Sequence, residues 1–74
     1  MIKREAQDLR ARVNDEVGYL GIKARASSYP GLGYQNPERD YFVSATWAKW
    51  DYRFVWFNEK EYELDKLSFG SSPK

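Results

Sequence analysis

The sequence predicts a single α+β domain in which one amphipathic helix packs on one face of an antiparallel sheet of three or four strands. Three observations lead to this fold class. Apolar residues recur every three or four positions over 2–17, they alternate with polar residues over 21–27, and eight of the thirteen aromatic residues lie within 41–57. A chain of 74 residues has the length of one domain. We expect a helix followed by four strands (α-β-β-β-β) over 1–69, and a flexible tail over 70–74.

The predicted helix spans 2–17 because its apolar residues form one narrow stripe. This stripe consists of Ile2, Ala6, Leu9, Val13 and Val17. Gly18 is predicted to end the helix, since glycine adopts a left-handed conformation without a steric penalty. The other side of the helix carries charges of both signs four positions apart, as in Arg12 and Glu16. Mixed charge is typical of a solvent-exposed face, and we prefer that interpretation to a basic docking helix.

Residues 21–27 predict a half-buried strand because their side chains alternate between two faces. One face carries Ile22, Ala24 and Ala26, and the other carries Lys23, Arg25 and Ser27. The two cations have two interpretations. They bind phosphate, or they protect an edge strand from pairing with another molecule, and we favour edge protection.

Residues 28–40 predict one long loop that contains the turn signal Pro30-Gly31. The loop also carries Tyr29, Leu32 and Tyr34, which is an unusual number of large side chains for a segment rich in glycine and proline. These residues either bind a partner or fold back over a small core. The glycines of the loop do not match a phosphate-binding pattern, because no Gly-Lys-Ser/Thr sequence follows them.

Residues 41–57 predict a hairpin of two aromatic strands. The segment is longer than the usual strand of about three to ten residues, so we place a turn at 48–51, between strands at 41–47 and 51–57. A connection of this length brings the following side chains onto one face: Val43, Ala45, Trp47, Tyr52, Phe54 and Trp56. The opposite face carries Phe42, Ser44, Thr46, Arg53, Val55 and Phe57. We expect one of the faces to meet the helix, and the other is too apolar to be a purely solvated surface.

The C-terminal segment has two interpretations. We prefer a last strand that contains Tyr62 and Leu64, after a turn at 58–61, to a short helix over 59–67, although Glu, Lys and Leu favour helix. A helix followed by three strands is similar to the order in which double-stranded-RNA-binding domains begin. The similarity covers element order alone. The second helix of that family, with its basic N-terminal cluster, is missing from the predicted order, and no residue role is carried over.

The composition argues against several classes of function. The chain has no histidine and no cysteine, which leaves no base with a pKa near neutrality, no thiol nucleophile and no structural zinc site. Its carboxylate pairs are explained by solvation of helices and turns, so we expect a protein that is not an enzyme and needs no metal or cofactor. The longest apolar runs are too short to cross a bilayer, and we expect a cytoplasmic protein that does not contact the membrane.

Binding is the remaining class, and two kinds of partner compete. We predict a small non-enzymatic module that acts by protein–protein contact, as do regulators and inhibitors of larger complexes that phages or mobile elements encode, with a homodimer as a further possibility. The predicted partner-binding residues are Tyr29, Leu32, Tyr34, Trp47, Trp50, Arg53 and Phe57. The alternative is a nucleic-acid-binding module that combines aromatic stacking with backbone contacts. These contacts would come from Lys23, Arg25, Lys49 and Arg53, although a net charge of +1 counts against this alternative.

Overall fold

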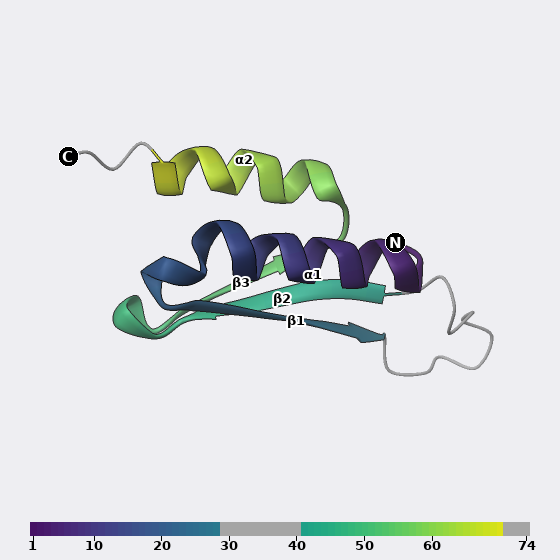
Figure 1. Ribbon diagram of the computed structural model, residues 1–74, viewed down its shortest axis with the longest axis horizontal. Coiled ribbons are helices and arrows are strands. Elements are labelled where there is room, and N and C mark those ends of the chain that lie inside the picture. The colour runs from purple at the N-terminus through teal and green to yellow at the C-terminus, as the bar shows by residue number, and fades with distance from the viewer. Residues whose placement is uncertain (29–40, 71–74) are drawn as a thin grey trace.

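A computed structural model describes residues 1–28 and 41–70 of the chain (Figure 1). Its elements, in order, are α1 (Lys3–Val17), the 3-10 helix η1 (Gly18–Leu20), β1 (Ile22–Ser28), β2 (Tyr41–Trp47), the 3-10 helix η2 (Ala48–Trp50), β3 (Tyr52–Trp56) and α2 (Glu59–Gly70). The strands form one antiparallel sheet in the order β1-β2-β3. Both helices lie on the same side of this sheet (Figure 1).

Helix α1 forms where the sequence predicts it. Its buried side chains are Ala6, Leu9, Val13 and Val17. Ile2 is largely exposed before the helix and does not belong to the stripe. Helix α1 ends at Gly18 as predicted, but the left-handed conformation expected there was wrong, because Gly18 keeps a right-handed conformation with φ of −61°. The chain continues into η1, and Gly21 with φ of 87° provides the left-handed residue before β1.

The aromatic hairpin has the predicted turn and register. Trp47 of β2 pairs with Tyr52 of β3, so four residues connect the strands. Within this connection η2 is followed by Asp51, which adopts a left-handed conformation with φ of 50°. The pairing continues from Ala24 of β1 through Ala45 of β2 to Phe54 of β3. The predicted common face is therefore confirmed, and it is the face on which the helices pack.

The size of the side chains on that face explains how closely each helix packs on the sheet. The face of β1 and β2 below α1 contains alanines at 24, 26 and 45, so the helix can approach the sheet closely. On β3 the same face carries Phe54 and Trp56, and these rings fill the space beneath α2. Trp56 contacts Tyr62 of α2 with ring centroids 5.1 Å apart, and Phe54 contacts Phe69 at 5.0 Å.

The prediction of a fourth strand was wrong, because residues 59–70 form a helix. Asn58 accepts a hydrogen bond from the Glu61 main chain at 3.1 Å, and the Glu61 carboxylate accepts one from Phe57 N–H at 2.7 Å. An Asn followed three residues later by Glu is the pattern of a helix N-terminus, and it identifies this start in the sequence. Leu64 is 68% exposed, so the alternation of Tyr62 and Leu64 does not mark a strand.

With α2 the element order becomes α-β-β-β-α. The similarity in element order to double-stranded-RNA-binding domains therefore includes a second helix. The first turn of α2 nevertheless contains Glu59 and Glu61, where duplex-RNA-binding domains carry a basic cluster. An acidic helix start repels phosphate, and the extended similarity therefore supports no residue role.

Candidate functional site

The structure divides the predicted partner-binding residues between two surfaces. Tyr29, Leu32 and Tyr34 lie outside the described residues. Trp47 and Trp50 lie at the end of the β2–β3 hairpin, on the side of the sheet that carries the helices. Arg53 lies on the opposite side of the sheet, where Phe57 contacts Phe42. The described residues of the predicted set therefore do not form one continuous patch.

The first surface is a groove of about 450 Å³ between the hairpin end and the last turns of α2. We call it the hairpin groove. Its lining consists of Trp47, Trp50, Tyr52, Phe54, Asp65, Ser68 and Phe69. The turn between β2 and β3 and the C-terminal end of α2 lie at the same end of the molecule (Figure 1). Sequence reasoning missed the contribution of α2, because that segment was predicted to be a strand.

The floor of the hairpin groove is held in place by packing and one hydrogen bond. Trp47 is half-buried, and its indole N–H donates to the Leu20 carbonyl at 3.0 Å. Its ring meets Phe69 edge-to-face, with centroids 5.4 Å apart. Trp47 therefore supports the groove from inside and is not an exposed contact residue.

The rim of the hairpin groove is exposed. Trp50 is 61% exposed and Tyr52 is 56% exposed. Trp50 meets Trp47 edge-to-face at 6.3 Å, and the ammonium of Lys49 lies 5.3 Å from the centre of the Trp50 ring. Lys49 thus belongs to the hairpin end and does not join Lys23 and Arg25, with which it was grouped as a nucleic-acid contact.

The second surface is the face of the sheet opposite the helices, which we call the open face. No helix of the described chain lies against it (Figure 1). The register places Lys23, Thr46 and Arg53 in one row across the strands, and Arg25, Ser44 and Val55 in the next. A shallow depression of about 600 Å³ is lined by Arg10, Lys23, Ala24, Arg25, Ser44, Thr46 and Arg53. Sequence reasoning identified the three strand cations but not Arg10, which lies on the predicted helix.

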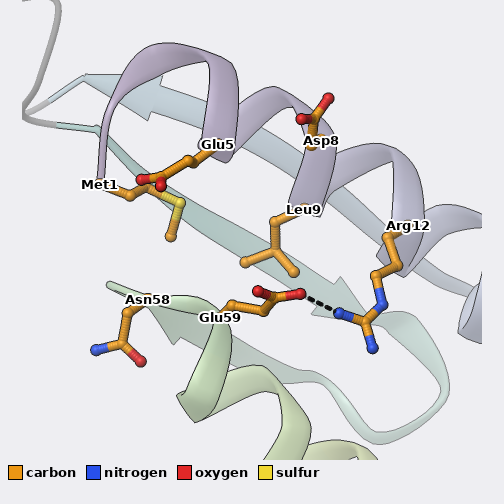
Figure 2. A pocket seen from close by; sticks show the side chains of 7 residues that line it. All are labelled: Met1, Glu5, Asp8, Leu9, Arg12, Asn58 and Glu59. Atoms are coloured by element: carbon orange, nitrogen blue, oxygen red, sulfur yellow. Dashed lines mark hydrogen bonds and ion pairs between the residues drawn. The ribbon is translucent and has the colours of Figure 1, made fainter.

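A third, polar pocket of about 300 Å³ lies where α1 meets the start of α2. Figure 2 shows its lining of Met1, Glu5, Asp8, Leu9, Arg12, Asn58 and Glu59. The guanidinium of Arg12 pairs with carboxylates from both helices, namely Glu16, Glu59 and Glu63. Its charge is used to join the helices, so we assign this pocket a structural role.

Two residues beside the Arg12 ion pairs, Glu16 and Tyr62, have pKa values that differ from their ordinary ones. Partial burial alone raises the pKa of Glu16, but hydrogen bonds from Tyr62, Lys66 and Arg12 outweigh it and leave that pKa below its usual value. The Tyr62 hydroxyl is 2.8 Å from Glu16, and burial together with this bond raises the pKa of Tyr62 well above the ordinary range. At neutral pH Glu16 is therefore ionised and Tyr62 is neutral.

Comparison with known proteins adds no functional assignment. No protein-family model, curated protein or solved structure matches the chain. In the described part of the chain, no helix is long and apolar enough to span a membrane. The same residues contain no cluster of three or more acidic, histidine or cysteine side chains placed to hold a metal ion.

Proposed function

We propose that the protein is a non-enzymatic binding module that acts by protein–protein contact through the hairpin groove. The observation that supports this proposal is the exposure of Trp50 and Tyr52 at the rim of a groove with an aromatic floor. Tryptophan and tyrosine are the residues that most often contribute large shares of binding energy at protein interfaces. Leaving two such rings in water has no benefit for the folded state by itself.

The rigidity of the groove also favours binding. Trp47 is hydrogen-bonded to Leu20, and Phe69 packs against both Trp47 and Phe54. A site whose side chains are already ordered loses little conformational entropy when a partner binds. A protein segment with an apolar side chain of suitable size can therefore insert without rearranging the floor.

The shape of the groove favours a different protein over a second copy. A twofold dimer brings the same surface of each subunit together. A groove at a twofold axis would face an identical groove, whereas a side chain that protrudes from another protein can enter it. Within this proposal the protein is a regulator or inhibitor that occupies a surface of a larger complex.

Site-specific crosslinking tests the location of the contact. We expect a photoreactive phenylalanine at Tyr52 to crosslink the partner, and the same group at Leu64 on the outer face of α2 not to do so. Crosslinking at Leu64 alone would move the interface to α2. Crosslinking between copies of the chain, together with a dimer in sedimentation equilibrium, would identify a homodimer instead.

Trp50→Ala is expected to weaken partner binding without unfolding the domain. Loss of a tryptophan that contributes strongly to an interface costs about 2 kcal/mol or more, which is roughly a thirtyfold loss in affinity. The measurement is titration of the identified partner with the wild type, Trp50→Ala and the control Leu64→Ala, with urea unfolding in parallel. Unchanged affinity for Trp50→Ala would exclude the hairpin groove.

A further inference from the structure

The charged residues of the three strands all have one sign. The described strands contain Lys23, Arg25 and Arg53 and no Asp or Glu. All three cations lie on the open face, because the register places them opposite the side chains that meet the helices. The molecule has nearly balanced charge as a whole, but this face is basic.

The register also brings these cations close to one another. Neighbouring strands are about 4.8 Å apart, and alternate residues on one strand are about 7 Å apart. Lys23 and Arg53 are separated by β2, while Arg25 follows Lys23 on β1. The three charges are thus spaced by about one Debye length at physiological salt, so their potentials add.

The cations of the open face are not used within the described part of the molecule. The ion pairs found there involve only Arg12 and Lys66 among the basic residues. Arg10, Lys23, Arg25 and Arg53 line the depression without an acidic neighbour in its lining. They therefore remain available to an anionic ligand.

Helix α1 already covers part of the edge that Lys23 and Arg25 were expected to protect. The side-chain amide of Asn14 accepts a hydrogen bond from Ala24 N–H at 2.8 Å and donates one to the Ala24 carbonyl at 3.2 Å. Helix α1 thereby occupies the outer edge of β1 at its middle. This finding weakens the interpretation that we favoured from the sequence.

A buried hydroxyl adds a hydrogen-bonding group to the same depression. Ser44 is 4% exposed and lines the depression between the cations. Among the described residues its side chain has no hydrogen-bond partner, although buried hydroxyls usually have one. Thr46, in the next row of the same strand, adds an exposed hydroxyl.

The other half of the open face is apolar and aromatic. The rings of Phe42 and Phe57 have centroids 6.0 Å apart, and Phe57 is 43% exposed. Val55 lies in the row of Arg25 and Ser44, and the row of Phe42 and Ser27 comes next to it. One continuous face thus combines cations, hydroxyls and aromatic rings.

We propose that the open face binds single-stranded nucleic acid, with phosphates on Lys23, Arg25 and Arg53 and a base against Phe57. Cations next to aromatic rings match the alternation of phosphate and base in a single strand. An acidic peptide has carboxylates for the cations but no bases that stack on the rings. A duplex hides its bases, and the acidic start of α2 does not favour duplex binding. This function is separate from protein contact at the hairpin groove, which lies on the other side of the sheet.

The experiment is a fluorescence-anisotropy titration with labelled oligothymidylate and oligouridylate over a range of salt concentrations. Contact with three or four phosphates gives a slope of log K against log salt of about −2 to −3, at about 0.7 per contact in single strands. The double variant Arg25→Gln/Arg53→Gln is expected to reduce the magnitude of this slope by about 1.4. The matched control Arg4→Gln/Lys60→Gln removes two exposed charges from the helices, and we expect it to retain the slope.

Phe57→Ala separates base stacking from simple attraction of anions. We expect roughly a tenfold loss in affinity with an unchanged salt slope, because stacking of one base is lost while the phosphate contacts remain. Urea unfolding of each variant verifies that it is folded. Trp50→Ala is expected to bind the oligonucleotide like the wild type, which keeps this test independent of the protein-contact proposal.

Three outcomes would overturn the proposal. The first is no binding of either oligonucleotide at the lowest salt concentration. The second is an equal loss in the Arg25/Arg53 variant and in the Arg4/Lys60 control, which would indicate unspecific attraction. The third is displacement of the oligonucleotide by polyglutamate as efficiently as by unlabelled oligonucleotide, which would identify the open face as a site for acidic protein segments.

Discussion

Trp56→Ala is expected to leave the protein barely stable at room temperature. Trp56 has no exposed surface, its ring packs between Phe54 and Tyr62, and its indole N–H donates to the Asp65 carboxylate at 2.6 Å. Truncating a buried tryptophan costs about 3–5 kcal/mol. A domain of this size has a total stability near the low end of about 5–15 kcal/mol, so the loss consumes most of it. Far-UV circular dichroism in a urea titration measures the effect.

Trp50→Ala provides the matched control because it removes the same side chain from an exposed position. Its ring contacts Trp47 at 6.3 Å, and we expect a loss of about 1 kcal/mol or less. If the Trp56 variant were as stable as the Trp50 variant, the core that we describe would be wrong. The contrast also shows which tryptophan can be replaced in binding experiments.

Arg12→Ala is expected to destabilise the protein by about 2 kcal/mol at neutral pH. The substitution leaves the carboxylates of Glu16, Glu59 and Glu63 near one another without their shared cation. Breaking a buried ion pair costs about 3–5 kcal/mol, and an exposed pair is worth at most about 1 kcal/mol. Arg12 and Glu16 are half-buried whereas Glu59 and Glu63 are exposed, which places the expected value between these limits.

This destabilisation should depend on pH in a defined direction. In the wild type the pKa of Glu16 is below its ordinary value of 4.5, so its stabilising contribution is present above that pH and is lost as the pH falls through the lowered value. In the variant Arg12 no longer lowers the pKa of Glu16, so its part of this contribution is missing. The difference in the free energy of unfolding between the two proteins should therefore shrink as the pH falls below 4.5.

Urea unfolding at several pH values measures this difference. Arg4→Ala, which removes an exposed cation from the same helix, is the control and should have a small effect at every pH. A difference that stayed constant or grew on acidification would show that Arg12 acts through packing against the Tyr62 ring, 5.4 Å away, and not through its charge.

The residues of the open face can be predicted from the sequence more completely than those of the hairpin groove. The cations of the open face follow from alternation in β1 and β3, since Lys23, Arg25 and Arg53 each stand next to a residue that faces the core. The hairpin groove does not follow in this way, because three of its seven lining residues come from α2. Trp47 and Trp50 are also indistinguishable by residue type, and only the position of Leu20 shows which indole is anchored.

The sequence by itself determined those helices and strands in which the spacing of apolar residues fits only one type of secondary structure. The spacing in α1, the alternation in β1 and the length of the aromatic segment predict the first helix, the strands and the turn at 48–51, because short-range geometry decides them. Over 59–70, helix propensity and apparent alternation conflict. The sequence marks the start of a helix at Asn58 and Glu61, and the tertiary structure decided that the helix continues. There Tyr62 and Phe69 become buried against Trp56 and Phe54, and the buried surface outweighs the local pattern. It also decided which sheet face both helices cover, since they bury their apolar sides on the aromatic face, and within the described residues no helix covers the basic face.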